Sequence, residues 1–244
     1  MLIARNPKFI FKALSGICLG AVVIAGCSAG RAAEPVADAT PSAPTTPATS
    51  VASSAPPVDA GRLRLALLPA PQGMRVVHGP ETGAFGSLES TKKGLAAARQ
   101  VSLARPECAG AAQLDAGEPA LANAPAAVVA YASDRGSITQ ALVAMPSPVF
   151  PPPLPAQCAD YTADVEGTRV TYGTRQLTMP RQGDESRAYL TTAVGGGQNA
   201  QVGSVVIRRG NVILSLLVVG RKVKSGGLFQ LAQVADRQLA KISR

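Results

Sequence analysis

The chain has 244 residues, with 24 Lys or Arg against 15 Asp or Glu and a formal net charge of +9. It contains no Trp, few other aromatic residues, and basic residues that are scattered along the chain. This pattern excludes the aromatic platform beside a basic groove that binders of single-stranded nucleic acid use. We therefore expect no nucleic-acid partner. The positive charge suits a solvated surface near anionic lipid headgroups.

The chain begins with a basic segment followed by a short apolar one. Arg5, Lys8 and Lys12 precede an uncharged, mostly apolar stretch at residues 13–26. A helix needs about 20 apolar residues to cross the hydrocarbon core, whereas the apolar region of a secretory signal has about 7–15. Residues 1–26 are therefore predicted to be an export signal.

The run Ile24-Ala25-Gly26-Cys27 ends that segment. It resembles the lipobox of bacterial lipoproteins, whose cysteine is diacylated on sulfur and becomes the first residue of the mature protein. The resemblance implies that fatty acyl chains such as palmitate on Cys27 anchor the protein to the extracytoplasmic face of the cell membrane. The alternative is an ordinary signal peptide with a chance cysteine. Removing the signal leaves 21 basic against 15 acidic residues, or +6.

Two cysteines, Cys108 and Cys158, remain once Cys18 leaves with the signal and Cys27 takes lipid. In an oxidising compartment an isolated pair predicts one disulfide. Two free thiols or part of a metal site are the alternatives. A metal site has little support, because the chain has one histidine, His78, and no Cys-x-x-Cys spacing. We expect no metal and no other cofactor.

Residues 28–60 have the composition of a linker. Ala, Pro, Ser and Thr fill 25 of these 33 positions, and none is Leu, Ile or aromatic. Such a segment cannot bury enough apolar surface to offset its chain entropy. The predicted organisation is a signal at 1–26, a lipidated cysteine with a disordered linker at 27–60, and one domain at 61–244. That domain is large enough for a single core.

Several elements are predicted along the first half of the domain. Asp59 is a candidate N-cap for a helix at 61–68, which Pro69 would stop. A strand is expected at 74–77 and a helix at 90–100. Asp134-Arg135-Gly136 is typical of a turn between two strands, at 126–133 and 137–145.

The second half reads as a series of strands at 168–179, 186–194, 202–208 and 212–219. Turn signals separate them, namely Gly183-Asp184, Gly195-Gly196-Gly197 and Arg209-Gly210-Asn211. Apart from Ser215, the last strand is apolar on both faces. Such a strand lies centrally in its sheet and is covered on both sides by a helix, another layer or an apolar ligand.

The final segment, 228–242, carries an apolar stripe at helical spacing: Leu228, Leu231, Ala232, Ala235, Leu239 and Ile242. A hairpin followed by this amphipathic helix predicts an antiparallel sheet flanked by helices in a single domain. The expected fold class is α+β.

Three short patterns suggest an enzyme and are rejected. Ser90-Thr91-Lys92-Lys93, Ser133-Asp134-Arg135 and Lys224-Ser225-Gly226 follow the motif order of penicillin-interacting serine enzymes. Arg135 stands where the second motif needs Asn, the third falls in a loop, and the domain is too short for that fold. A Ser-His-Asp triad would have to use His78, but the chain has no G-x-S-x-G elbow to hold the nucleophilic serine. No catalytic residue is therefore expected.

Asp184 and Glu185 are also considered as a carboxylate pair. Adjacent residues at the start of a strand point in different directions, so this interpretation is disfavoured. Asp184 is predicted instead to be a turn former that accepts local backbone N–H bonds. Gly195-Gly196-Gly197 lacks a following Gly-Lys-Ser/Thr and is predicted to be a hairpin connection rather than a phosphate loop.

The order of short motifs resembles the exported sensor-type domains of actinobacteria, known as the extracellular part of PknH-type receptor kinases and found on envelope lipoproteins. The similarity covers residues 63–243. It rests on Leu67-Leu68-Pro69, Pro71-Gln72-Gly73-Met74, Pro106-Glu107-Cys108, Cys158-Ala159-Asp160-Tyr161-Thr162, Gly183-Asp184-Glu185-Ser186 and Arg208-Arg209-Gly210-Asn211-Val212. It implies an antiparallel sheet with flanking helices and a cleft for an extracellular ligand. Unlike kinase sensors with two disulfides, this chain can make only one.

Two functions follow from these observations. The first is a tethered, non-catalytic module of the cell envelope that binds an extracellular small molecule, lipid or envelope protein at residues not identified from sequence. The alternative is a lipid or glycolipid carrier, with the strand at 212–219 lining a deep apolar cavity. Cavity size separates the two, because a carrier needs a closed pocket near or above the upper end of about 300–1,000 Å³.

Replacing Cys27 with Ser tests the predicted tether. The Cys27→Ser protein should still be exported but should appear in the medium or the soluble fraction, because it lacks the acylated sulfur. Fractionation followed by immunoblotting measures this. Membrane retention at the wild-type level would show that another feature anchors the chain.

Overall fold

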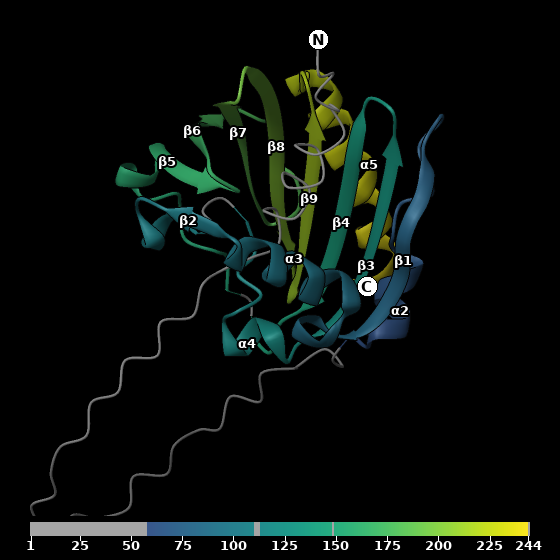
Figure 1. Cartoon of the computed structure of the whole chain (residues 1–244). Coiled ribbons are helices and arrows are strands. Elements are labelled where there is room, and N and C mark those ends of the chain that lie inside the picture. The colour runs from purple at the N-terminus through teal and green to yellow at the C-terminus, as the bar shows by residue number, and fades with distance from the viewer. Residues whose placement is uncertain (1–57, 110–112, 148, 244) are drawn as a thin grey trace, which may run out of the picture. The chain divides into compact units, whose positions relative to one another are not determined.

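A computed structural model describes residues 58–109, 113–147 and 149–243. The predicted signal, Cys27 and nearly all of the predicted linker lie outside these residues. The described part forms one antiparallel sheet in the order β1-β3-β4-β9-β8-β7-β6-β5-β2, with helices on its faces (Figure 1). The expected α+β class agrees with this mostly β architecture.

The bounds of the strands follow chain order: β1 Arg75–Ala84, β2 Val101–Leu103, β3 Pro125–Ser133, β4 Gly136–Ala144, β5 Asp160–Val165, β6 Thr168–Leu177, β7 Glu185–Gly195, β8 Gln198–Arg209 and β9 Val212–Gly220. The helices are α2 Ala60–Leu65, α3 Glu89–Arg99, α4 Pro119–Ala122 and α5 Ser225–Ile242. Single 3₁₀ turns are η1 Phe85–Ser87, η2 Pro106–Cys108 and η3 Ala156–Cys158. None of the described helices has both the length and the apolar character of a membrane span.

Strands β5 to β9 form a continuous meander, and β9 then pairs with β4 of the β3–β4 hairpin. The hairpins expected around Asp134-Arg135-Gly136 and Arg209-Gly210-Asn211 are both present. Gly196 and Gly197 form the β7–β8 turn with left-handed φ angles of 58° and 74°, as expected of a hairpin connection.

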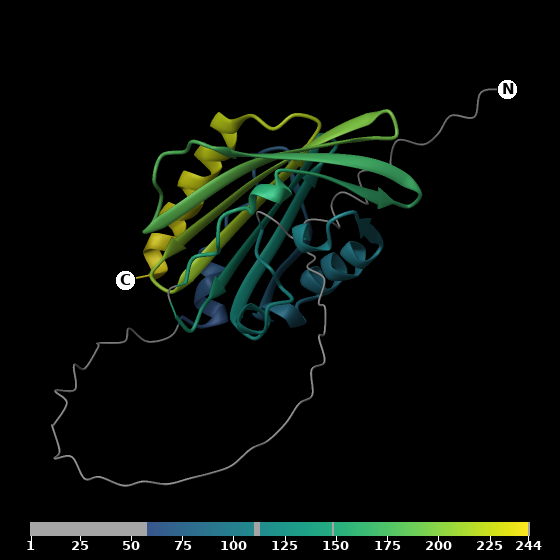
Figure 2. The ribbon, with the colours of Figure 1, turned by 90° about the vertical axis from the view of Figure 1, so that its left-hand side faces the viewer.

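One face of the sheet is covered by α5 and α2 (Figure 2). The apolar stripe of α5 is buried here, with Leu228, Ala232, Ala235, Leu239 and Ile242 inside the largest core cluster. Leu231, which was expected in the same stripe, is only partly buried. The period of 3.6 residues thus predicted the buried face of this helix.

Helix α2 begins at the cap expected from sequence. The Asp59 side chain accepts a hydrogen bond from the Arg62 amide at 2.9 Å. The chain that follows α2 is fixed to the sheet at Leu68, whose amide donates to Gln140 Oε1 at 2.7 Å. The Tyr131 hydroxyl donates to the Leu68 carbonyl, and burial raises the pKa of this tyrosine.

The opposite face is crossed by the connection from β1 through α3 to β2. Because β1 and β2 are the two edge strands, this connection carries the chain from one edge of the sheet to the other. Helix α3 contacts both edge strands on the way. A second core cluster lies on this face and includes Phe85, Leu121, Val128 and Ile213.

Strand β9 is central and buried on both faces, as its composition predicted. Val212, Leu214 and Leu216 belong to the core under α5, whereas Ile213 belongs to the second core cluster. Ser215, the polar exception, is also buried at 5% exposure. The two-faced apolar pattern therefore reflects cover by helices on one side and by the crossing segments on the other.

The structure extends the predicted elements in several places. Val58, expected in the linker, is 6% exposed and packs into the main core, so the folded part begins before residue 61. Strand β8 begins at Gln198 rather than at residue 202. The elements β2, β5 and α4 were not predicted, because each is short or weakly patterned.

A cluster of charged residues joins α5 to the turns at one end of the sheet. Arg209 forms two hydrogen bonds with Asp236 of α5, at 3.0 and 2.9 Å. The Asp236 side chain is 9% exposed and also accepts from the Gly183 amide at 3.2 Å. The hydrogen bonds to Asp236 raise the pKa of Arg209. This partly buried pair fixes the helix against the β8–β9 turn.

Gly183 is required at this corner. Its φ of +56° lies in the left-handed region, and a Cβ there would stand 2.4 Å from the Arg208 carbonyl oxygen. Only glycine fits so close to neighbouring backbone without displacing it.

Replacing Asp236 with Ala should lower the free energy of unfolding by about 2–3 kcal/mol, because it leaves Arg209 without its partner in a mostly buried setting. Urea denaturation measures the loss. Arg237→Ala, at the exposed neighbouring position of the same helix, is the matched control and should change stability by less than about 0.5 kcal/mol. Equal losses in the two variants would contradict the role assigned to Asp236.

Candidate functional site: a pocket beneath the proline-rich loop

A pocket of about 430 Å³ opens on the sheet face opposite α5. Its floor is formed by β7, β8 and β9, through Tyr189, Val206 and Ile213. One wall is the segment that leads into α4, with lining residues between Gln113 and Glu118. The other wall is the proline-rich loop that follows β4, with lining residues between Met145 and Pro155. Most of the lining is apolar: Ala109, Leu114, Ala120, Leu121, Met145, Pro146, Val149, Phe150, Pro151, Pro152, Pro153, Leu154, Pro155, Val206 and Ile213.

The proline-rich wall is held in place by two side chains of β7. Arg187 donates to the Pro151 carbonyl at 2.9 Å, and its guanidinium lies 4.9 Å from the centre of the Phe150 ring. The Tyr189 hydroxyl accepts from the Leu154 amide at 3.0 Å. Prolines have no backbone donor and a fixed φ, so a loop rich in them keeps its shape with few hydrogen bonds. The wall is therefore preformed.

A few polar groups face this apolar space. The Oε1 atom of Gln113 is buried and has no hydrogen-bond partner among the described residues. Asp115 and Glu118 lie on the same wall and are exposed. A buried acceptor without a donor is costly, by about 1–3 kcal/mol. A ligand that donates a hydrogen bond would offset that cost, as would a water in the adjoining void of about 10 Å³ lined by Gln113, Thr139 and Ser215.

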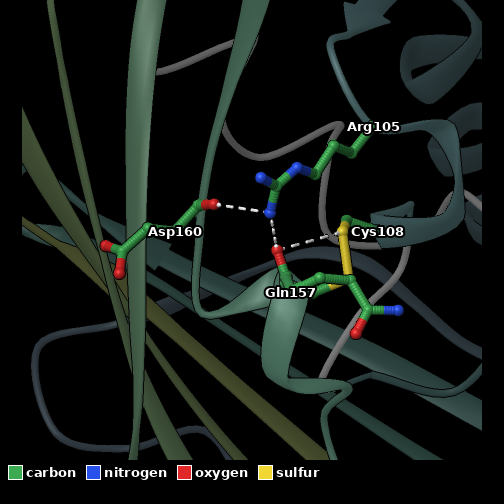
Figure 3. The surroundings of a disulfide bond; sticks show 5 residues. Arg105, Cys108, Gln157 and Asp160 are labelled. Atoms are coloured by element: carbon green, nitrogen blue, oxygen red, sulfur yellow. Dashed lines mark hydrogen bonds between the residues drawn. A yellow bond between two sulfur atoms is a disulfide. The ribbon is translucent and has the colours of Figure 1, made fainter.

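The cysteine pair connects the ends of the two walls (Figure 3). The sulfur atoms of Cys108 and Cys158 lie at disulfide-bond distance, 2.04 Å, with Cα atoms 5.3 Å apart. Cys108 immediately precedes the wall that leads into α4, and Cys158 closes the proline-rich side. Both residues are buried, at 1% and 0% exposure. The bond expected from sequence thus ties together the two segments that enclose the pocket.

Arg105 strengthens the same junction. Its guanidinium donates to the Gln157 carbonyl and, at 3.5 Å, to the Asp160 carbonyl, as Figure 3 shows. Together with the disulfide, this contact holds η2 and η3 side by side. The pocket walls are consequently anchored at one end covalently and by hydrogen bonds.

The residues of the serine-enzyme pattern are engaged elsewhere. The Ser90 hydroxyl donates to Glu81 at 3.0 Å, and the Lys93 ammonium lies 2.5 Å from Glu89. That contact lowers the pKa of Glu89, first through the hydrogen bond and then through the charge of Lys93. Ser133 ends β3, and Lys224 is the N-cap of α5. None of these residues lines the pocket.

The remaining candidates also take structural positions. His78, considered from the sequence for a metal site and for a catalytic triad, lies on edge strand β1 and is partly buried. Asp184 was predicted to accept local N–H groups, whereas it accepts from Gly210 at 2.7 Å across the corner. Glu185 lies beside it, and both carboxylates contact Arg208, at 3.2 and 2.6 Å. The two adjacent carboxylates therefore both pair with one arginine, Arg208.

Sequence reasoning missed the polar groups of the pocket. Arg187 and Tyr189 lie two residues apart on β7, with the buried Ala188 and Leu190 facing the other way. That alternation was a signal that both side chains share one face of the strand. What they contact depends on a loop more than 30 residues earlier, which no local pattern reveals.

The fold is similar to that of a solved extracellular domain, while the sequence comparisons find no match. No protein-family model matches the chain, and no curated protein matches it in sequence. The crystal structure of the extracellular domain of PknH from Mycobacterium tuberculosis aligns with a TM-score of 0.51 and 16% identity, covering 76% of this chain and 97% of that one. An uncharacterized Mycobacterium smegmatis protein, a Rv0999 ortholog, aligns with a TM-score of 0.45 and 15% identity, covering 76% and 95%. The first alignment supports the PknH-like fold expected from the motif order.

Loss of the Cys108–Cys158 bond should weaken both the fold and the pocket walls. The bond spans a sequence separation of 50 residues, for which the chain-entropy model gives about 4 kcal/mol. The double variant Cys108→Ala/Cys158→Ala should lose about 2–5 kcal/mol in urea denaturation. Thiol titration of the oxidised, unfolded wild type should find no free thiol at these positions, and two titratable thiols would refute the bond.

Proposed function

We propose that the chain is a membrane-tethered, extracytoplasmic lipoprotein whose folded domain is a non-catalytic, sensor-like binding module. The observation that carries the proposal is the pocket beneath the proline-rich loop. Its walls are held by Arg187, Tyr189 and the cysteine pair. A preformed apolar cavity with a few convergent polar groups is the usual form of a small-molecule site.

The residues that line the pocket indicate which class of ligand it would bind. The wide apolar surface favours an aliphatic or aromatic body, and the buried Gln113 Oε1 favours a hydroxyl or amide donor on it. The exposed carboxylates of Asp115 and Glu118 give the wall leading into α4 negative charge. A neutral or cationic amphiphilic molecule fits these features better than an anion.

The volume favours a small ligand over a carrier's cargo. About 430 Å³ lies in the lower half of the range for small-molecule sites, below the size expected of a lipid carrier. Only Ile213 of β9 lines this pocket. This pocket is therefore not a deep cavity along the whole strand, on which the carrier alternative depends.

Three further observations support the remaining parts of the proposal. The lipobox-like run at Cys27 favours a lipid tether, and the likeness to a kinase extracellular domain favours an extracytoplasmic place for the fold. The non-catalytic role is supported by the engagement of Ser90 and Lys93 with glutamates outside the pocket.

Blocking the pocket tests this proposal. Ala120 is an exposed residue of α4 that lines the pocket, and Ala120→Trp should fill part of it. Ala96→Trp is the matched control, since Ala96 is an exposed helical alanine of α3 away from the pocket. Native mass spectrometry of protein purified from its own envelope should find a small bound molecule in the wild type and control, reduced at least about tenfold in Ala120→Trp.

Other outcomes would overturn the proposal. A ligand retained equally by Ala120→Trp binds elsewhere. A bound phospholipid or glycolipid in all three proteins would favour the carrier alternative. Absence of any adduct, with no binding from a soluble extract of the same envelope, would contradict a small-molecule site in this pocket.

A further inference from the structure

Three metal-ligating side chains converge at the junction of β1 and α3, outside the pocket. One atom each from His78, Glu81 and Glu89 lies within 4.8 Å of the others. His78 and Glu81 belong to edge strand β1, and Glu89 is the first residue of α3. The side chains of His78 and Glu81 are 24% and 19% exposed, whereas that of Glu89 is 65% exposed. The cluster is thus buried on one side and open to solvent on the other.

An irregularity in β1 places His78 and Glu81 on the same face. Between them, β1 advances three residues while its partner β3 advances two, from Ala130 to Val128. Residues three apart in a regular strand face opposite sides of the sheet, and the extra residue cancels that difference. Gly79 makes the bulge possible, because its φ is +73° and a Cβ there would stand 2.5 Å from the Val128 carbonyl oxygen.

Glu81 is oriented by a neighbour so that one of its oxygens faces the histidine. Its Oε2 accepts from the amide and the hydroxyl of Ser90, at 3.1 and 3.0 Å. Its Oε1 contacts Nε2 of His78. Hydrogen bonds to a second carboxylate oxygen are the usual way in which proteins hold a metal-binding carboxylate in position.

The Nε2 atom of His78 needs a proton or a metal ion where it faces the Glu81 carboxylate. Nε2 is closed off from solvent and does not form a hydrogen bond with any described residue, although it touches Glu81. A lone pair facing a carboxylate is repulsive. Either a proton on Nε2 or a metal ion therefore has to lie between the two groups.

We propose that His78, Glu81 and Glu89 bind a divalent transition-metal ion, with Zn²⁺ the best match. One imidazole and two carboxylates form a three-ligand set of the open type, which leaves a position for water. Hard ions such as Ca²⁺ and Mg²⁺ prefer oxygen ligands alone. Metal–ligand bonds of about 2.0–2.2 Å in a tetrahedral site put the ligand atoms about 3.4 Å apart. Nε2 of His78 must therefore move away from the Glu81 oxygen that it touches, and Glu89 must approach both groups.

The exposed Glu89 side chain can make its part of this adjustment. It is paired with Lys93 at 2.5 Å, but both side chains are about two-thirds exposed. Exposed pairs of this kind contribute little, so a divalent ion can displace the lysine. The bound ion would join the edge strand β1 to the beginning of the helix that crosses to β2.

Zinc titration of the mature protein in detergent tests the proposal. The protein is prepared without a histidine tag and treated with EDTA, so that His78 is its only imidazole. Isothermal titration should show one Zn²⁺ per chain, and the single set of histidine NMR resonances should shift with the same stoichiometry. The melting temperature should rise with Zn²⁺ because the ion binds the folded state.

Three variants make the outcome decisive. Glu89→Gln changes an exposed residue and leaves the fold intact, and it should weaken Zn²⁺ binding at least about tenfold, as should His78→Ala. Glu107→Gln removes an exposed carboxylate away from the cluster and should bind as the wild type does. Absence of saturable binding overturns the proposal, and so does binding that either ligand variant leaves within about twofold of wild type. The cluster would then be a histidine–carboxylate contact only.

Discussion

The need to cover the central strands on both faces determines the rest of this structure. Strands β8 and β9 direct Val205, Ile207 and Leu214 to one face, and Val206 and Ile213 to the other. A sheet with two apolar faces is stable only when both are removed from water, at about 25 cal/mol for each Å² of apolar surface. On one face, helix α5 covers the apolar side chains of the sheet. The other face is covered mainly by irregular chain, and the pocket lies within that cover.

The two faces of the sheet are covered by different kinds of structure, and this difference explains where the pocket lies. Helix α5 is 18 residues long and buries one continuous stripe, so little space remains beneath it. On the opposite face, α4 has four residues, and the described residues of the proline-rich loop form neither helix nor strand. Segments of this kind do not interdigitate as completely as a long helix. They can leave a defined cavity, provided that side chains such as Arg187 and Tyr189 hold them at a distance from the sheet.

Local patterns were sufficient to predict the elements that depend on local physics. Each of these elements depends on residues only a few positions apart in the sequence. They are the stripe of α5, the cap at Asp59 and the hairpins at Asp134-Arg135-Gly136 and Arg209-Gly210-Asn211. The two-faced composition of β9 correctly indicated a central strand. The short strand β2 could not be predicted in this way, because it exists only through pairing with β5, some 60 residues later. Its three residues carry no pattern of their own.

The same distinction separates the predictable from the unpredictable parts of the candidate sites. Cys108 and Cys158 could be paired by elimination, since two cysteines allow one partner each. The pocket could not be predicted, because its lining comes from segments as distant as Ala109 and Ile213. The cluster at His78 depends on a bulge, and a regular strand would have sent Glu81 to the opposite face. One inserted residue therefore decides whether His78 has a carboxylate neighbour on its own strand, and no spacing of residue types in the sequence reveals that insertion.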